Sequence, residues 1–500
     1  MSLQSKKLTE GSLLAKNTLY SLIGYIIPVI VALFAIPILI NSLGVDKFGV
    51  LTLAWMITGY FSILDLGIGR ALTKLLSEKL GNDDMKNIPS LISTSLIVTT
   101  ACGLFGCAVL TLYSSNLVTS LFKIPAELHD DVIRSFYVLA LSIPFVINVA
   151  ALRGILEAYQ RFDLINILRI PIASSTFLVP VLISQLSEEL FHIVIGLVIV
   201  RVVEIFVNLI FCKKVVSNMY KNQIFNSSIF KELINFGGWM TISNLIGPMI
   251  LYIDRFLIGS IISVGAVSFY SASYEIVNRM MVIPGAVVGV LFPAIGVLIG
   301  NDKDRAIEIF YQGMKYTLLI IFPIVLIIFI FSEEGLSLWL GDEFASKGTN
   351  VLRILIVGSL IMSVSYFPFA VMHAAGKPKV IAIIHIIEVP TYAIIAVMLI
   401  RSYGIEGAAF AWLIRLVVDT VVLFYFAGKE LNINYHFKRI LLTAGLILLI
   451  FLISFFISNN FILKLSFGFT ILAFFLLYAY NKMLNFKEKE YLLSLKNKFF

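Results

Sequence analysis

Ten ionisable side chains fall inside stretches of the sequence that are otherwise almost entirely apolar. They are Asp65, Arg201, Glu204, Asp254, Arg255, Glu275, Arg279, Glu388, Arg415 and Asp419. A charge at the centre of a membrane helix costs at least roughly 2.5 to 3.5 kcal/mol on insertion scales, so such residues are usually paired or functional. These ten residues are therefore the first candidates for a binding site.

Three pairs among them have helical spacing. Glu275 and Arg279 are four residues apart, as are Arg415 and Asp419, while Arg201 and Glu204 are three apart. Residues at these spacings share one face of a helix, so each pair is predicted to form an ion pair within its own helix. Such pairs either lock helices together or belong to a site.

Asp254 and Arg255, in the stretch "PMILYIDRFLIGS", do not have this spacing. Adjacent helical residues point about 100° apart, which predicts that the two cannot neutralise each other along one face. We expect their partners in the interior between the two halves of the chain. The alternative is that the Arg255 side chain extends to the outer membrane interface.

The chemistry of these residues predicts two kinds of site. Arginine offers planar donors that match phosphate oxygens, so the candidates for an anion-binding cationic cavity are Arg255, Arg279, Arg415 and Arg201. A carboxylate in a low-dielectric cavity can take up H⁺ or Na⁺. The candidates for such ion coupling are Asp254, Glu275, Asp65 and Asp419, although Asp65 could instead pair with Arg70 or cap a helix.

The composition indicates an integral membrane protein. Of 500 residues, 59% are hydrophobic and 14% charged, and the mean hydropathy is +0.97. Because a membrane helix needs about 20 apolar residues, the sequence predicts about fourteen transmembrane helices. Their approximate limits are 18–40, 48–69, 89–112, 132–152, 169–185, 190–212, 233–257, 264–290, 314–332, 350–371, 380–400, 405–427, 439–458 and 462–480. The short loops leave no room for a soluble catalytic domain.

Lysine and arginine concentrate in alternate loops, which predicts that both termini are cytoplasmic. The N-terminal segment lacks a clear cleavage site and is expected to be retained. The C-terminal "NFKEKEYLLSLKNKFF" is expected to lie on the inner membrane surface.

Three landmarks recur at the same offset of 219 residues, which indicates an internal repeat. They are Gly-Asn-Asp at 81–83 and 300–302, Arg134 and Arg353, and Pro171 and Pro390. The repeat predicts an N-terminal six-helix bundle at 1–218, a second at 219–436, and two additional helices with a tail at 437–500. Since six is even, the two bundles are related by a pseudo-two-fold axis along the membrane normal.

Other chemistry is not indicated. The sequence has no P-loop, its histidines lack metal-ligand spacing, and its three cysteines show no C-x-x-C pattern, so neither a cofactor nor a metal is expected. The net charge of +8 is scattered in short clusters and forms no nucleic-acid motif.

Two stretches carry a resemblance to a known family. "NSLGVDKFGVLTLAWMITGYFSILDLGIGRALTKLLSE" and "YIDRFLIGSIISVGAVSFYSASYEIVNRMMVIPGAVVGVLFPAIG" resemble the oligosaccharide (O-antigen type) flippases of the MATE-like multidrug/oligosaccharidyl-lipid/polysaccharide exporter superfamily. The resemblance implies an alternating-access, ion-coupled transporter that moves undecaprenyl-diphosphate-linked repeat units from the cytoplasmic to the outer leaflet of the plasma (inner) membrane. Its implied partners are the lipid-linked oligosaccharide, membrane lipids, and a polymerase and other export-pathway proteins.

Three alternatives stay open at this point. A multidrug/cation antiporter of the same fold would present acids and aromatic residues to its substrates, because fold alone does not fix substrate. A membrane-bound polymerase would need a large outer loop, which the sequence lacks. A scramblase-like protein would not need the internal repeat.

Overall fold

The computed structural model describes residues 11–61, 67–81, 87–159, 161–216, 225–433, 451, 460–484 and 488–490. Helices make up nearly all of this part and no strand occurs in it. Nine of the described helices are long and apolar enough to cross a membrane. The predicted all-α membrane fold is confirmed, whereas the total of fourteen helices stays a prediction.

The chain forms two compact units, Met1–Ser271 and Ala272–Phe500. The helices of the first unit are α2 (Gly11–Phe61), α3 (Ile68–Gly81), α4 (Ile88–Asn116), α5 (His129–Ala158), α6 (Phe162–Ser184), α7 (Leu190–Val215) and α8 (Ser227–Ile261). Two short elements, η3 (Leu117–Leu121) and η4 (Ala126–Leu128), connect α4 to α5. The division predicted at residue 218 stays a prediction.

The second unit begins within α9 (Val264–Met280). Its further helices are α10 (Val282–Asn301), α11 (Lys303–Ile330), α12 (Ser332–Leu340), α13 (Asp342–Ala374), α14 (Pro378–Leu431) and α16 (Phe461–Tyr478), followed by η5 (Ala479–Met483). The predicted helix at 439–458 lies outside the described residues, apart from Phe451.

Two long helices bend at glycines with positive φ. In α2 the break is at Gly44, with φ 76°, and in α14 it is at Gly404, with φ 61°. Glycine adopts this left-handed conformation at little cost because it has no Cβ. Each bend falls between two of the predicted spans, 18–40 and 48–69 in α2, and 380–400 and 405–427 in α14.

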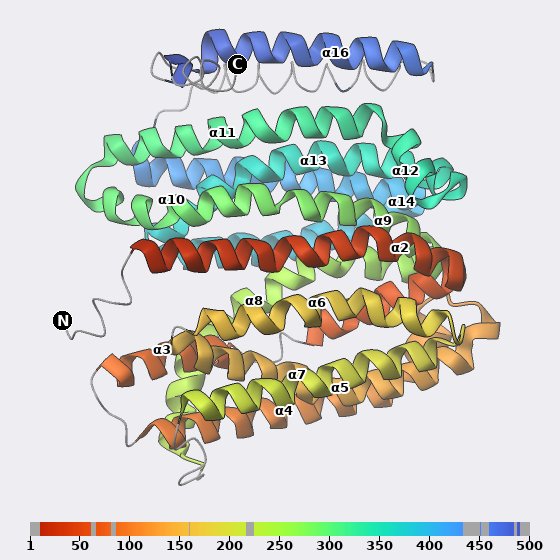
Figure 1. Cartoon of the computed structure of the whole chain (residues 1–500), viewed down its shortest axis with the longest axis vertical. Helices are drawn as coiled ribbons and strands as arrows, with labels where there is room; N and C mark the ends of the chain where they lie inside the picture. Colours follow the sequence, from red (N-terminus) through yellow and green to blue (C-terminus); the bar gives the residue numbers. More distant parts are fainter. Residues whose placement is uncertain are drawn as a thin grey trace. The chain divides into compact units, whose positions relative to one another are not determined.

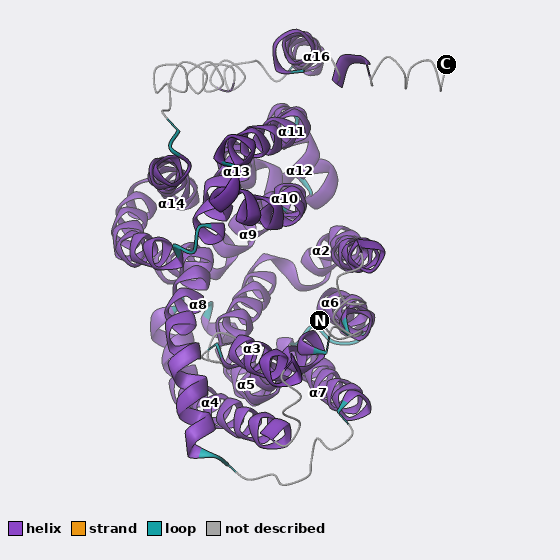
Figure 2. Ribbon diagram, turned by 90° about the vertical axis from the view of Figure 1, so that its left-hand side faces the viewer, coloured by secondary structure: helices purple, strands orange, loops and turns teal. Residues whose placement is uncertain are grey.

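Within the first unit the helices pack in the order α4, α5, α7, α6 and α2 (Figures 1 and 2). A polar contact holds α4 to α5, where Asn148 accepts a hydrogen bond from Thr99 Oγ1 at 2.8 Å and donates one to Thr100 Oγ1 at 3.0 Å. At the start of α7 the Asp131 carboxylate accepts from the backbone N–H groups of Leu190 and Phe191. This carboxylate caps the helix and fixes α7 against α5.

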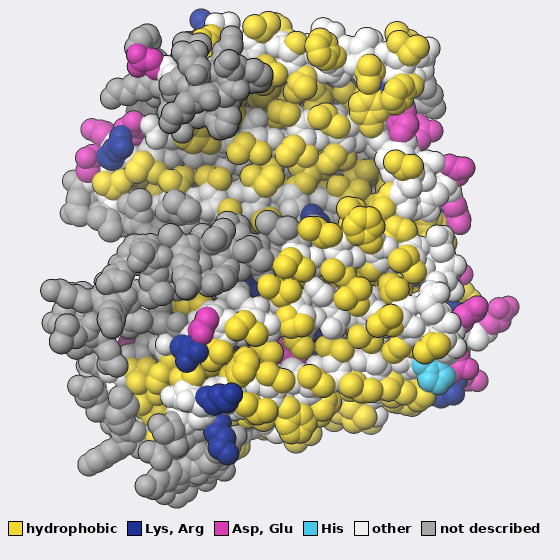
Figure 3. Space-filling view, in the orientation of Figure 1, with side chains coloured by type: hydrophobic (Ala, Val, Ile, Leu, Met, Phe, Trp, Pro, Cys, Tyr) yellow, Lys and Arg dark blue, Asp and Glu magenta, His cyan; other side chains and the backbone are white. Residues whose placement is uncertain are grey.

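Within the second unit α13 packs against α14, α11 and α12, and α10 packs against α11. One hydrophobic core there includes Ile295, Phe310, Phe367 and Leu423. Figure 3 shows hydrophobic side chains along the helix walls and most of the charged ones near helix ends. This distribution is expected of helices that face lipid along their length.

The close packing of α4 on α5 depends on Gly103. A Cβ at Gly103 would lie 2.5 Å from Pro144 Cα, which is too close. We expect Gly103→Ala to lower the free energy of unfolding by about 1–3 kcal/mol because the helices must separate or distort. Thermal unfolding of the purified protein in detergent measures this. The control is Gly289→Ala in α10, where no heavy atom lies within 4 Å of the new Cβ. Equal stability of both variants would contradict the packing argument.

Candidate functional site

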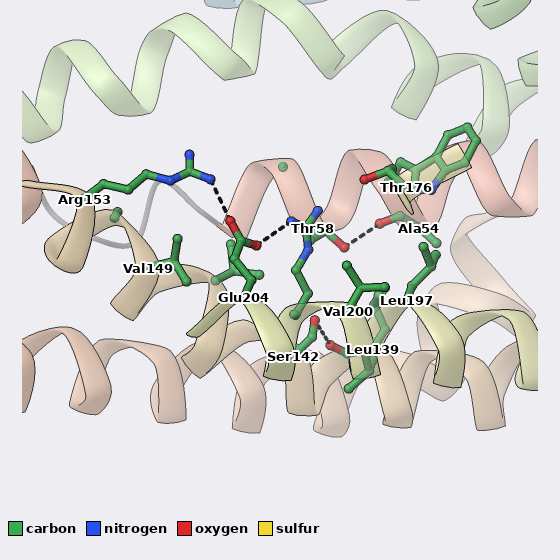
Figure 4. Close-up of a pocket in the computed structure, with 16 residues that line it drawn as sticks. Ala54, Thr58, Leu139, Ser142, Val149, Arg153, Thr176, Leu197, Val200 and Glu204 are labelled. Atoms are coloured by element: carbon green, nitrogen blue, oxygen red, sulfur yellow. Dashed lines mark hydrogen bonds and ion pairs between the residues drawn. The ribbon is translucent and has the colours of Figure 1, made fainter. Parts of the chain in front are cut away.

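A cavity of about 370 Å³ lies within the first unit. Side chains from α2, α5, α6 and α7 line it, and Figure 4 shows most of them converging from these helices. Most of the lining is apolar, as in typical ligand pockets, with a few polar groups that can orient a ligand. The charged lining residues are Arg153, Arg201 and Glu204.

The three charged residues form one connected group. Arg153 Nη2 lies 2.6 Å from Glu204 Oε1, and Arg201 Nη1 lies 2.8 Å from Glu204 Oε2 (Figure 4). The Glu204 side chain is only 2% exposed, whereas those of Arg153 and Arg201 are 37% and 26% exposed. Two guanidinium groups and one carboxylate leave one net positive charge. The buried acid therefore holds both cations at the cavity wall without neutralising the cavity.

The helix arrangement sets this geometry. Arg153 lies on α5, and Arg201 and Glu204 lie on α7. The Asp131 cap fixes the start of α7 to α5, and the Arg153–Glu204 ion pair joins the same two helices farther along. Two contacts at separate points hold α5 and α7 in one register, which positions both guanidinium groups.

Trp55 adds a hydrogen-bond donor to the same cavity. Its indole Nε1 is buried and has no hydrogen-bond partner among the described residues. The ring is held edge-on against Phe177, with centroids 5.2 Å apart, and against Phe48 at 6.3 Å. A buried polar group without a partner is costly, so a ligand that accepts from Trp55 would be favoured.

Asp254 and Arg255 lie elsewhere in the first unit and are not among the residues that line this cavity. Arg255 Nη1 is 3.6 Å from Asp254 Oδ1 and donates to the Leu251 carbonyl at 2.8 Å, while Tyr270 Oη donates to Asp254 Oδ2 at 2.6 Å. The prediction that these neighbours cannot pair is wrong, because the long arginine side chain folds back along its own helix.

The predicted pairs within single helices have mixed outcomes. The ion pairs Arg201–Glu204 and Glu275–Arg279 are confirmed. The predicted ion pair of Arg415 with Asp419 is wrong. Arg415 Nη1 instead lies 3.0 Å from Glu388 Oε1, across the bend of α14 at Gly404. Glu388, on the other segment of α14, is therefore closer to the Arg415 guanidinium than Asp419, which lies one turn away on the same segment.

Asp419 belongs to a second polar group, in the second unit. His385 Nε2 lies 4.0 Å from both Glu388 Oε2 and Asp419 Oδ1. These two carboxylate oxygens are buried and have no hydrogen-bond partner in the described part of the chain. The three ligand atoms lie within 4.8 Å of one another and could hold a cation. The histidine spacing in the sequence did not indicate this group.

Sequence reasoning missed Arg153 and Trp55. The predicted helix at 132–152 ends just before Arg153, whereas α5 continues to Ala158 and keeps Arg153 in the helix. Its partner Glu204 is 51 residues away, a separation that no helical periodicity reveals. Asp65 lies outside the described residues, so its role stays a prediction.

Comparison with known proteins identifies the family. Residues 38–349 match the model of the family described as "Polysaccharide biosynthesis protein". The chain is 31% identical over 412 residues to a putative O-antigen transporter of Shigella flexneri, covering 82% of this chain and 96% of the relative. The chain belongs to this polysaccharide biosynthesis family. The resemblance to the oligosaccharide flippases is thereby confirmed, and several relatives of the chain are named as transporters or flippases.

A further relative and two solved structures are also similar to the chain. A probable low-salt glycan biosynthesis flippase of Haloferax volcanii is 25% identical over 211 residues, covering 42% of this chain and 44% of that protein. The lipid II flippase MurJ has a TM-score of 0.70 at 16% identity, covering 93% of this chain and all of that one. An inward-facing MATE-family multidrug transporter also reaches 0.70 at 15% identity, covering 80% and 94%. The fold is therefore that of MATE-like transporters.

The Asp254–Arg255 group yields a stability prediction. Asp254→Ala removes the carboxylate that Arg255 and Tyr270 contact in a buried setting. We expect the free energy of unfolding to fall by about 3 kcal/mol or more, because breaking a buried ion pair leaves a charge uncompensated. The control is Asp163→Ala, which breaks the exposed Arg161–Asp163 pair and is expected to cost less than about 1 kcal/mol. Thermal unfolding in detergent compares them, and equal losses would show that Asp254 is not a buried structural partner.

Proposed function

We propose that this flippase moves a lipid-linked oligosaccharide with a diphosphate headgroup, such as an undecaprenyl-diphosphate-linked repeat unit, across the membrane by alternating access. The observation that carries the proposal is the net positive group Arg153–Glu204–Arg201 at the wall of a cavity. The putative O-antigen transporter of Shigella flexneri, similar over most of the chain, supports the substrate class.

The chemistry of the cavity fits a phosphate group. Each guanidinium donates one hydrogen bond to Glu204 and has five N–H donors in all, arranged in a planar fork. Because both arginine side chains are partly exposed, their outer edges can contact a ligand. A volume of about 370 Å³ suits a diphosphate with its first sugar, so the rest of the repeat unit would extend outside.

Trp55 is suited to contact a sugar next to that phosphate. Its unpartnered indole N–H can donate to a hydroxyl, and its ring face is apolar, as sugar ring faces are. A multidrug antiporter for cations is disfavoured at this cavity, because a cationic drug would be repelled by the excess guanidinium charge.

For ion coupling we propose the group of His385, Glu388, Arg415 and Asp419. Two carboxylates and one guanidinium leave one negative charge when the histidine is neutral, so uptake of one H⁺ or Na⁺ completes the charge balance. The unpartnered oxygens of Glu388 and Asp419 are where that ion would bind. Transport is driven only if the ion binds the two conformations with different affinity.

The proposed location is the plasma (inner) membrane, with both termini cytoplasmic. The distribution of lysine and arginine among the loops supports this orientation. A polymerase and other export-pathway proteins are the proposed partners. Arg255, Arg279, Asp254 and Glu275 remain candidates for contacts with the substrate or coupling ion in other conformations.

Substituting the cavity arginines tests the substrate proposal. We expect Arg153→Gln and Arg201→Gln each to weaken binding of an undecaprenyl diphosphate oligosaccharide about tenfold to a hundredfold, because hydrogen bonds to charged groups contribute about 1.5–3 kcal/mol. Binding to the purified protein and surface polysaccharide at equal protein level are the measurements. The control is Arg161→Gln, whose partner Asp163 lies outside the cavity. Wild-type binding by both cavity variants would refute the anion site.

Asp419→Asn tests the coupling proposal. The substitution removes the excess negative charge, so we expect flipping in proteoliposomes to lose its dependence on the driving ion gradient. Proton and sodium gradients are applied separately to identify the ion. Glu430→Gln is the control on the same helix, since Glu430 lies 3.8 Å from Lys377 and apart from this group. Unchanged gradient dependence in Asp419→Asn would exclude the site.

A further inference from the structure

A second cavity in the first unit has the opposite chemistry to the arginine-lined one. It has a volume of about 530 Å³ and is lined by side chains of α2, α4 and α8 and of the segment after α4. Among the described lining residues none is charged, and they include Ile57, Leu110, Ile253 and Phe256. We call this the apolar cavity. Apart from the hydroxyls of three tyrosines its lining is hydrocarbon, so it favours a hydrocarbon ligand over a charged one.

Two of the helices that line the apolar cavity contain candidate membrane spans. Its walls belong to α2 and α4, whose described residues include the candidate membrane spans Ile30–Phe61 and Ile88–Leu121. Phe122 and Phe256, with ring centroids 5.4 Å apart, contribute to its wall. Near them the backbone of Lys123 donates to the Gly259 carbonyl at 2.9 Å, which holds the segment after η3 to the end of α8. The cavity is therefore formed by packed, connected elements.

The two cavities share one wall, residues 54–61 of α2. Ala54, Trp55, Thr58 and Gly59 line the arginine-lined cavity, whereas Met56, Ile57, Tyr60 and Phe61 line the apolar one. These two sets alternate as expected for opposite faces of one helix. One side of this segment therefore contacts a cationic cavity and the other a hydrocarbon cavity.

At Gly59 the residues that line the two cavities meet. A Cβ on Gly59 would lie 2.8 Å from the hydroxyl of Tyr252, a residue of α8 that lines the apolar cavity. Gly59 itself lines the arginine-lined cavity. The two cavities therefore adjoin at this position, where the anionic part and the hydrocarbon part of one molecule would be bound close to each other.

We propose that the apolar cavity binds the polyisoprenoid chain of the lipid-linked substrate while Arg153 and Arg201 hold its diphosphate. This inference rests on the proposed function and adds a binding site for the other end of the same molecule. Lipid tails are as apolar as the lining, so entering the cavity gains little hydrophobic free energy. The site acts by packing and by placing the first isoprene units next to the headgroup.

The experiment compares a long and a short ligand on the full-length protein in detergent. The long ligand is undecaprenyl diphosphate and the short one is methyl diphosphate, which has the same headgroup and no isoprene unit. The variants Ile57→Trp and Ile253→Trp fill the apolar cavity from α2 and from α8. The control is Leu104→Trp on α4, whose side chain is 59% exposed and does not line the cavity.

We expect each filling variant to bind undecaprenyl diphosphate about tenfold more weakly. Binding of methyl diphosphate should stay within about twofold of wild type, and the control should bind both ligands normally. Unchanged affinity for the long ligand would overturn the inference. An equal loss for both ligands would also overturn it, since that result would mean a distorted headgroup site.

A photoreactive side chain identifies the occupant directly. With p-benzoylphenylalanine at Tyr60, we expect irradiation to crosslink undecaprenyl diphosphate added to the membrane, detected by mass spectrometry. Capture of phospholipid alone, at saturating undecaprenyl diphosphate, would overturn the inference in favour of a bilayer-lipid site.

Failure of the proposed function can be distinguished from failure of the hydrocarbon site. The proposed function predicts that Arg153→Gln and Arg201→Gln weaken binding of both ligands. The hydrocarbon site predicts only a difference between the long and the short ligand. If those arginine variants bind both ligands normally while Ile57→Trp still discriminates, the anion site is wrong and the hydrocarbon site stands.

Discussion

The buried carboxylate of Glu204 is the interaction on which the first unit depends. It lies among membrane-spanning helices, where an isolated charge would be very costly, and two arginines stabilise it at 2.6 and 2.8 Å. Because Arg153 comes from α5 and Glu204 from α7, this stabilisation also fixes how the two helices pack. Folding requires that the Glu204 carboxylate be paired, and pairing it with two arginines leaves one positive charge in excess at the cavity. An anionic ligand would bind to that excess charge.

One charged group in each unit has a net charge, and the two net charges have opposite sign. In the first unit the Arg153–Glu204–Arg201 group has one positive charge in excess. In the second, Glu388, Asp419 and Arg415 leave one negative charge when His385 is neutral. A transporter that couples an anionic headgroup to a cation needs both kinds of site in one chain. Coupling then requires that occupancy of each site changes the relative stability of the same two conformations.

The sequence predicted what depends on local geometry. Membrane helices follow from long apolar runs. The bends at Gly44 and Gly404 fall between predicted spans, at glycines whose positive φ other residues rarely adopt. Ion pairs such as Arg201–Glu204 follow from the pitch of a single helix. Arg153 and the Arg415–Glu388 contact were not predictable, since both depend on which residues two separate helical segments bring opposite each other. The failure at Asp254 and Arg255 has another cause: Cβ directions alone do not describe a side chain as long and flexible as arginine.

Residues 54–61 of α2 separate two cavities of different chemistry. A soluble helix typically has one apolar face toward the core and one polar face toward water. Here both faces of residues 54–61 line cavities. The polar groups of Trp55 and Thr58 lie on the face toward the arginine-lined cavity, and the apolar side chains of Met56 and Ile57 lie on the face toward the apolar cavity. Gly59 is the position where Tyr252 of α8 approaches the helix backbone. A displacement of α8 would therefore change the wall between the two cavities directly, so the positions of the headgroup and of the hydrocarbon chain would respond to the same movement.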